Sequence, residues 1–222
     1  EYIYSLKNEK SQFHFHPAAD GLTNWGKKIR LGFSCFAIKC FYMLGEWDSL
    51  EDDKKSNWID YINSFQIKND KYIENSYVDE VFLDYYQSYD LQRDIKNLLK
   101  SGINIILPNR YESKNDRLVK TFVAESKQAI ATLNQIGSVN KLPYYEFPQR
   151  DHDINNYLNR FNWNRPWNAG AQFASICVFS STQLKNEDKK QSFSILENFI
   201  NNKLNHDSGL YFTGQYPGSV ES

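Results

Sequence analysis

The chain has 222 residues, enough for one large domain or two small ones. Hydrophobic residues make up 41% of it, charged residues 24% and aromatic residues 16%, a composition typical of a globular protein with a well-filled core. The formal net charge of −1 argues against nucleic-acid binding through neutralisation of phosphates.

The sequence has no run of about 20 apolar residues, so we expect no membrane span. Its first residues lack the basic and apolar regions of a signal peptide. Cys35, Cys40 and Cys177 lie within apolar helical patterns, and their spacing fits no zinc motif. We therefore expect a cytoplasmic protein with reduced thiols, no metal and no cofactor.

Residues 1–22 show no regular pattern and are predicted to be irregular. Apolar residues then recur at helical spacing, which predicts a first helix over residues 23–45 and a second over residues 49–65. The same spacing predicts a third helix over residues 78–89. A fourth begins at Leu91 and is expected to stop at Gly102.

Residues 103–108 form a short run rich in isoleucine. A single strand has nothing to pair with, so an extended connection is predicted there. A fifth helix follows over residues 116–137, with Leu118, Phe122, Ala129 and Ile130 on its buried side.

The most informative stretch covers residues 155–173. A sixth helix enters it and ends before Pro166, which lacks an N–H and disfavours helix at Arg165. A seventh helix leaves it, with small residues near its start (Ala169, Gly170) and apolar residues after them. An eighth helix covers residues 193–204. Pro at the first position is common in helices, so the seventh is expected to start at Pro166.

Trp163 and Trp167 bracket this turn. The favoured interpretation is that both rings plug the end of the hairpin, each with its N–H hydrogen-bonded. The alternative is an aromatic platform for a sugar or a prenyl chain.

Eight helices in succession predict an all-α fold of helical hairpins, forming one domain over residues 1–222. The loops after alternate helices each hold an aromatic residue, at intervals near forty residues, which is typical of a helical repeat array. These aromatic residues are Tyr72, Tyr111, Trp167 and Tyr211.

Two of these loops resemble each other most. Residues 66–72 and 205–211 each place an amide, a turn residue four positions later and a tyrosine two beyond it. They resemble degenerate Gln-x-x-x-Gly-x-Trp loops of the terpenoid cyclase and protein prenyltransferase α/α-toroid superfamily. Residues 20–23, 31–39 and 166–170 also resemble toroid proteins of bacterial surface-polysaccharide gene clusters.

The resemblance implies a ring of hairpins in which odd-numbered helices line the inside. It also implies about five to seven hairpins, so we expect this chain to be a partial toroid whose C-terminal hairpins are missing. The Asp-x-Asp-Asp motif of terpene cyclases is absent from the chain. No cysteine has a histidine placed to complete the zinc site of the prenyltransferases.

Polar residues on the presumed inner helices remain as candidate site residues. Glu125 is the best-placed carboxylate and can act as a general acid or base, with Asp79 or Asp84 as the second acid of a glycosidase pair. The favoured alternative is that Glu125 and Gln128 form hydrogen bonds between packed helices. The candidate substrate-binding residues are Gln128, Trp163, Trp167, Asn168, Gln172, Tyr72 and Tyr211.

Three functions stay open. The first is a toroid protein that binds a glycan or a protein partner in surface-polysaccharide metabolism. The second is a carbohydrate-active hydrolase or lyase that uses Glu125, and the third is a prenyl- or terpenoid-handling enzyme. A polar cavity with paired acids favours the second, an apolar aromatic cavity the third, and an inner face with isolated polar residues the first.

Overall fold

The computed structural model describes residues 2–9, 11–68, 73–89, 91–106, 113–163, 166–204 and 206–207. Over these residues the regular elements are nine α-helices and one 3₁₀ helix, and the extended pairings between two described residues are the isolated bridges Lys7–Phe15 and Gln66–Tyr77. The predicted all-α class is thus confirmed for this part of the chain, while the toroid arrangement stays a prediction. None of the described helices has the length and apolar composition that a membrane crossing requires.

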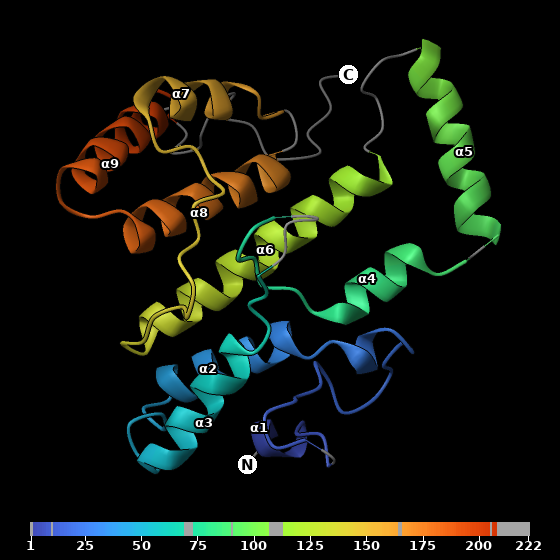
Figure 1. Ribbon diagram of the computed structural model, residues 1–222, viewed down its shortest axis with the longest axis vertical. Helices are drawn as coiled ribbons and strands as arrows, with labels where there is room; N and C mark the ends of the chain where they lie inside the picture. Colours follow the sequence, from blue (N-terminus) through green and yellow to red (C-terminus); the bar gives the residue numbers. More distant parts are fainter. Residues whose placement is uncertain are drawn as a thin grey trace. The chain divides into compact units, whose positions relative to one another are not determined.

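The chain divides into two compact units, Glu1–Pro143 and Tyr144–Ser222, and each is described by itself. The prediction of one domain over residues 1–222 stays a prediction. The elements of the first unit are α1 (Tyr2–Ser5), η1 (Gly26–Lys28), α2 (Leu31–Met43), α3 (Asp52–Asn63), α4 (Glu80–Gln87), α5 (Leu91–Ile106) and α6 (Lys114–Gln135) (Figure 1).

Trp58 of α3 lies at the centre of an aromatic cluster in the first unit. It is 1% exposed, and its indole N–H donates to the hydroxyl of Ser34 on α2 at 2.8 Å. Phe13 and Phe15 stack on its ring at centroid distances of 5.3 Å and 5.4 Å. The segment predicted to be irregular therefore supplies core residues, and α2 packs against both α3 and α6.

Two helix boundaries in the first unit differ from the prediction by more than three residues. Residues 23–45 are not one helix, because the chain breaks between η1 and α2. The extended connection predicted at residues 103–106 is wrong, because α5 continues through Gly102 to Ile106. A glycine weakens a helix by only about 1 kcal/mol, and the apolar spacing continues across it.

The second unit consists of α7 (Asp151–Asn159), α8 (Pro166–Gln183) and α9 (Asn186–Asn201) (Figure 1). The predicted helix start at Pro166 is confirmed. The three helices pack around one apolar cluster, whose buried members are Ile154, Leu158, Phe161, Ala169, Ile176 and Leu196.

Candidate functional site

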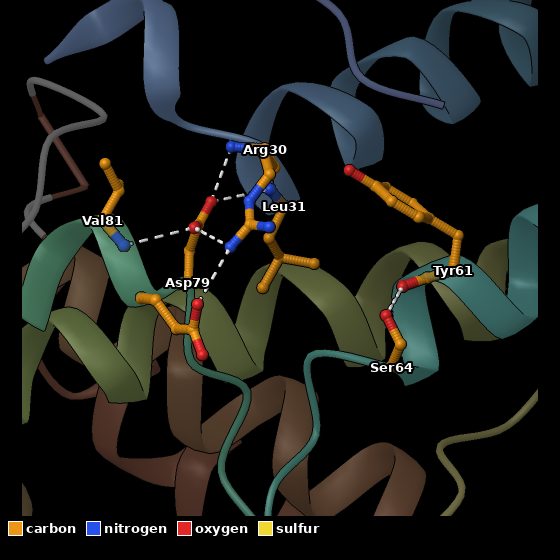
Figure 2. A network of polar contacts seen from close by, with 7 residues as sticks. Arg30, Leu31, Tyr61, Ser64, Asp79 and Val81 are labelled. Atoms are coloured by element: carbon orange, nitrogen blue, oxygen red, sulfur yellow. Dashed lines mark hydrogen bonds and ion pairs between the residues drawn. The ribbon is translucent and has the colours of Figure 1, made fainter. Parts of the chain in front are cut away.

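Asp79 is the fully buried N-cap residue of α4 (Figure 2). Its Oδ2 accepts the backbone N–H groups of Arg30 at 2.6 Å and Leu31 at 3.0 Å, where α2 begins. Its Oδ1 accepts the N–H of Val81 and a guanidinium N–H of Arg30, each at 3.4 Å. One carboxylate therefore caps two helices that are distant in sequence, and negative charge is favourable at both N-termini.

This capping explains the break in the predicted first helix. The backbone N–H groups of Arg30 and Leu31 are among the four that a helix leaves without an internal partner. Asp79 satisfies them only if the helix begins at this point, so α2 starts at Leu31 instead of continuing from η1. Arg30 strengthens the arrangement through a second ion pair, at 3.7 Å, to Glu80 of α4.

Glu125 lies in the middle of α6 and faces α2. A Cβ placed on Gly32 would lie 3.7 Å from its Oε1, and its Oε2 is buried without a hydrogen-bond partner. Burial, with a further contribution from the negative charge of Asp79, raises the pKa of Glu125 from 4.5 to about 8. Glu125 is therefore mostly protonated at pH 7, and the structure brings it close enough to Asp79 for their charges to interact.

Gln128 lies one turn after Glu125 and also faces α2. Its Oε1 accepts from the Lys39 ammonium at 3.3 Å, while its Nε2 is buried without a partner. Cys35 of α2 lies close enough to Glu125 and Lys39 to interact with them electrostatically. Burial raises the pKa of its thiol to about 12, which makes it a poor nucleophile. The interface of α2 and α6 therefore holds isolated polar groups among packed helices.

Asp84, the third predicted acid, is exposed on α4 and takes no part in this network. No group of three or more metal-binding side chains occurs among the described residues. The structure thus brings Glu125 near Asp79, places Gln128 one turn further along the same interface, and leaves Asp84 on the surface.

The two tryptophans of the turn have different environments. Trp163 is partly buried, its N–H points to the carbonyl of Leu158 at 3.4 Å, and Phe161 and Phe199 lie at centroid distances of 5.8 Å. Trp167 is 88% exposed at the start of α8. The core-plug interpretation fits Trp163 and is wrong for Trp167.

The remaining substrate-binding candidates are Asn168 and Gln172 on α8, together with Tyr72 and Tyr211. Asn168 is exposed, and its carbonyl accepts from the side chain of the half-buried Gln172 at 3.3 Å, as one turn of α8 permits. Tyr72 and Tyr211 lie outside the described residues, as does the Tyr111 loop. The aromatic-loop repeat therefore stays a prediction.

A cavity of about 500 Å³, which sequence reasoning missed, lies along α7 in the second unit. Arg150 precedes this helix, Arg160 follows it, and Asp153 and Asn156 lie on the helix between them. Asp153, Asn156 and Arg160 follow the spacing i, i+3 and i+7, which places them on one face of α7. This pattern is visible in the sequence. The full lining is Phe147, Pro148, Gln149, Arg150, Asp153, Asn156, Tyr157 and Arg160.

Two further cavities differ in chemistry. One, of about 340 Å³, lies between α7 and α9 and is lined by Asn155, Asn159, Asn198 and Asn202 together with Ile195, Phe199 and Lys203. The other, of about 230 Å³, is mainly apolar and lies in the first unit, with Phe15, Phe33 and Phe36 among its lining residues. Glu125 lines none of these three cavities.

The chain matches no protein-family model, no curated protein and no solved structure. The resemblance to the α/α-toroid superfamily therefore stays a hypothesis.

Proposed function

We propose that this protein binds an acidic glycan in the cavity along α7, as a toroid-like protein of bacterial surface-polysaccharide metabolism. The observation that carries the proposal is the lining of that cavity, where Arg150 and Arg160 occur together with Asp153 and Asn156. An arginine can hold a sugar carboxylate through two parallel hydrogen bonds. Carboxylate and amide oxygens accept from sugar hydroxyls, and the amide N–H groups donate to them.

The dimensions of the cavity also suit an oligosaccharide. Its volume of about 500 Å³ lies within the usual range of small-molecule sites. The helix rises roughly 15 Å between Arg150 and Arg160, which favours an extended ligand over a single compact anion. Phe147 and Tyr157 supply aromatic surface beside the polar groups.

Titration calorimetry of the full chain with oligogalacturonate and with neutral cello-oligosaccharides tests this proposal. We expect the acidic ligand alone to bind, and Arg150→Gln and Arg160→Gln each to weaken binding about tenfold, as expected for a lost charge-assisted hydrogen bond. Lys189→Gln, a charge loss at an exposed position of α9 outside the cavity, serves as the matched control. Equal binding of neutral and acidic ligands, or unchanged affinity in both arginine variants, would contradict the proposal.

A carbohydrate-active enzyme is the second candidate, favoured by the environments of two carboxyl groups. Glu125 is protonated near neutral pH, as a general acid must be, and the carboxylate of Asp79 lies near enough to raise its pKa. However, Asp79 already accepts three backbone N–H groups and Arg30, so it has little capacity left to attack a substrate or activate water. If the enzyme hypothesis holds, Glu125→Gln should abolish glycan cleavage while the melting temperature at pH 6 changes by only a few degrees.

The prenyl- or terpenoid-handling alternative ranks third. Its one supporting feature is the apolar cavity of about 230 Å³ in the first unit. His16 is the only ionisable side chain in that lining apart from the Cys40 thiol, which provides little to hold a diphosphate group.

A further inference from the structure

Helix α5 carries an exposed apolar face. With about 100° of rotation per residue, one side of this 16-residue helix collects Leu91, Ile95, Leu98, Leu99, Ile103, Ile105 and Ile106. All seven side chains are exposed, including Leu98 at 74%, Ile105 at 84% and Ile106 at 80%. Large apolar side chains gathered on one exposed face mark a surface for interaction.

The opposite side of α5 makes a hydrogen bond to the rest of the unit. Asn97 lies there, and its Oδ1 accepts from the guanidinium of Arg117 on α6 at 2.8 Å. This hydrogen bond to α6 therefore comes from the polar side of α5.

The charges on α5 indicate what this face contacts. Among the side chains described on the helix, Lys96 and Lys100 are basic and Asp94 is the one acid. Lys96 lies beside the edge of the apolar face, and Lys100 lies one turn further on and nearer the polar side. Long basic side chains in such positions reach lipid headgroups while the leucines insert below them. Tyr89, 82% exposed, lies just before the helix, and tyrosine favours the membrane–water interface.

We propose that α5 binds the surface of an anionic membrane, lying in the plane of the interface with its apolar face inserted. Basic amphipathic helices bind in this way through buried apolar area and through attraction to anionic lipids. The charge pattern disfavours a second copy of the chain as the occupant. Two copies packed antiparallel through this face would bring the Lys96–Lys100 edge of one beside the same edge of the other, and like charges in such positions repel.

Cosedimentation of the full chain with vesicles tests the proposal. We expect binding to vesicles of equal parts phosphatidylglycerol and phosphatidylcholine, weak binding to phosphatidylcholine alone, and loss of the difference at high salt. The double variant Lys96→Gln/Lys100→Gln should bind anionic vesicles about 25-fold more weakly, roughly fivefold for each lysine. The variant Leu98→Gln/Leu99→Gln should not bind them.

The matched control is Met43→Gln/Leu44→Gln, which replaces another adjacent exposed pair, 71% and 66% exposed, at the end of α2. It should bind like the unaltered chain, and circular dichroism checks that each variant is folded. Failure of the unaltered chain to bind anionic vesicles, or equal binding to both vesicle types, would overturn the proposal. So would a dimer in analytical ultracentrifugation that the Leu98→Gln/Leu99→Gln variant abolishes, because the face would then be a self-interface. These outcomes do not depend on glycan binding, which the proposed function places in the other unit.

Discussion

Asp79 is the residue whose loss should affect the first unit most through hydrogen bonding. Asp79→Asn keeps the shape of the side chain but removes the negative charge at two helix N-termini, and its amide nitrogen cannot accept the N–H groups that point at a carboxylate oxygen in the unaltered chain. We expect the free energy of unfolding to fall by about 2–4 kcal/mol in urea titrations. Asp84→Asn, on the exposed side of the same helix, should change it by less than about 0.5 kcal/mol. Similar losses for the two variants would contradict the capping role.

Glu125 makes a separate prediction about pH. Its folded-state pKa of about 8 lies above the ordinary value of 4.5, so the folded chain holds this proton more tightly than the unfolded chain does. Protonation of Glu125 makes its full contribution to the free energy of unfolding below pH 4.5. This contribution is lost as the pH rises to 8, by at most about 1.4 kcal/mol per pH unit. Glu125→Gln removes this dependence. In urea unfolding at pH 5, 7 and 9, the free energy of unfolding of the variant should therefore rise relative to that of the unaltered chain as the pH increases. The same pH dependence of stability in both proteins would indicate a solvated carboxylate.

At the scale of single elements, helical periodicity predicted most of the helices, because an amphipathic stripe is a local property of the sequence. The proline rule likewise located the start of α8 at Pro166. The break before α2 was not predictable, because it depends on Asp79, which is 48 residues from Leu31 in sequence. Gly102 was misread as a helix end, since a glycine that continues a helix and one that ends it look alike without their neighbours.

The candidate site was less predictable than the helices. Glu125 was recognisable as a carboxyl group interrupting an apolar run, but its protonation depends on burial against α2, which no local pattern reveals. The α7 cavity was missed because its arginines flank the helix, where charged residues are usually solvated. Trp163 and Trp167, four residues apart in one turn, differ in exposure, and only the packing of the second unit's helices around their apolar cluster decides which ring is partly buried.

This difference between the tryptophans can be tested within the turn that joins α7 to α8. Trp163→Ala should lower the free energy of unfolding by about 2 kcal/mol, less than the roughly 3–5 kcal/mol of a fully buried ring, because Trp163 is only partly buried. Trp167→Ala should change it by less than about 0.5 kcal/mol. Chemical denaturation of the two variants in parallel measures both values, and a large loss at Trp167 would restore its interpretation as a core plug.

For the whole molecule, the open question is whether the two units fold as one. Each has an apolar core of its own, around Trp58 in the first unit and around Leu158 in the second. Local opening measured by hydrogen exchange reports which segments share a cooperative unit. The substitutions Leu133→Ala on α6 and Leu158→Ala on α7 both remove a fully buried side chain and should each cost about 2–5 kcal/mol.

We expect Leu158→Ala to accelerate amide exchange in α7, α8 and α9 and to leave α2, α3 and α6 unchanged. Leu133→Ala should have the reverse effect, because a cavity destabilises the cooperative unit that contains it. A toroid that folds as a single domain would respond differently, with either substitution accelerating exchange across both units by similar factors. Mass spectrometry of the exchanged peptides separates these outcomes, and the second outcome would favour the single domain expected from the sequence over two cooperative units.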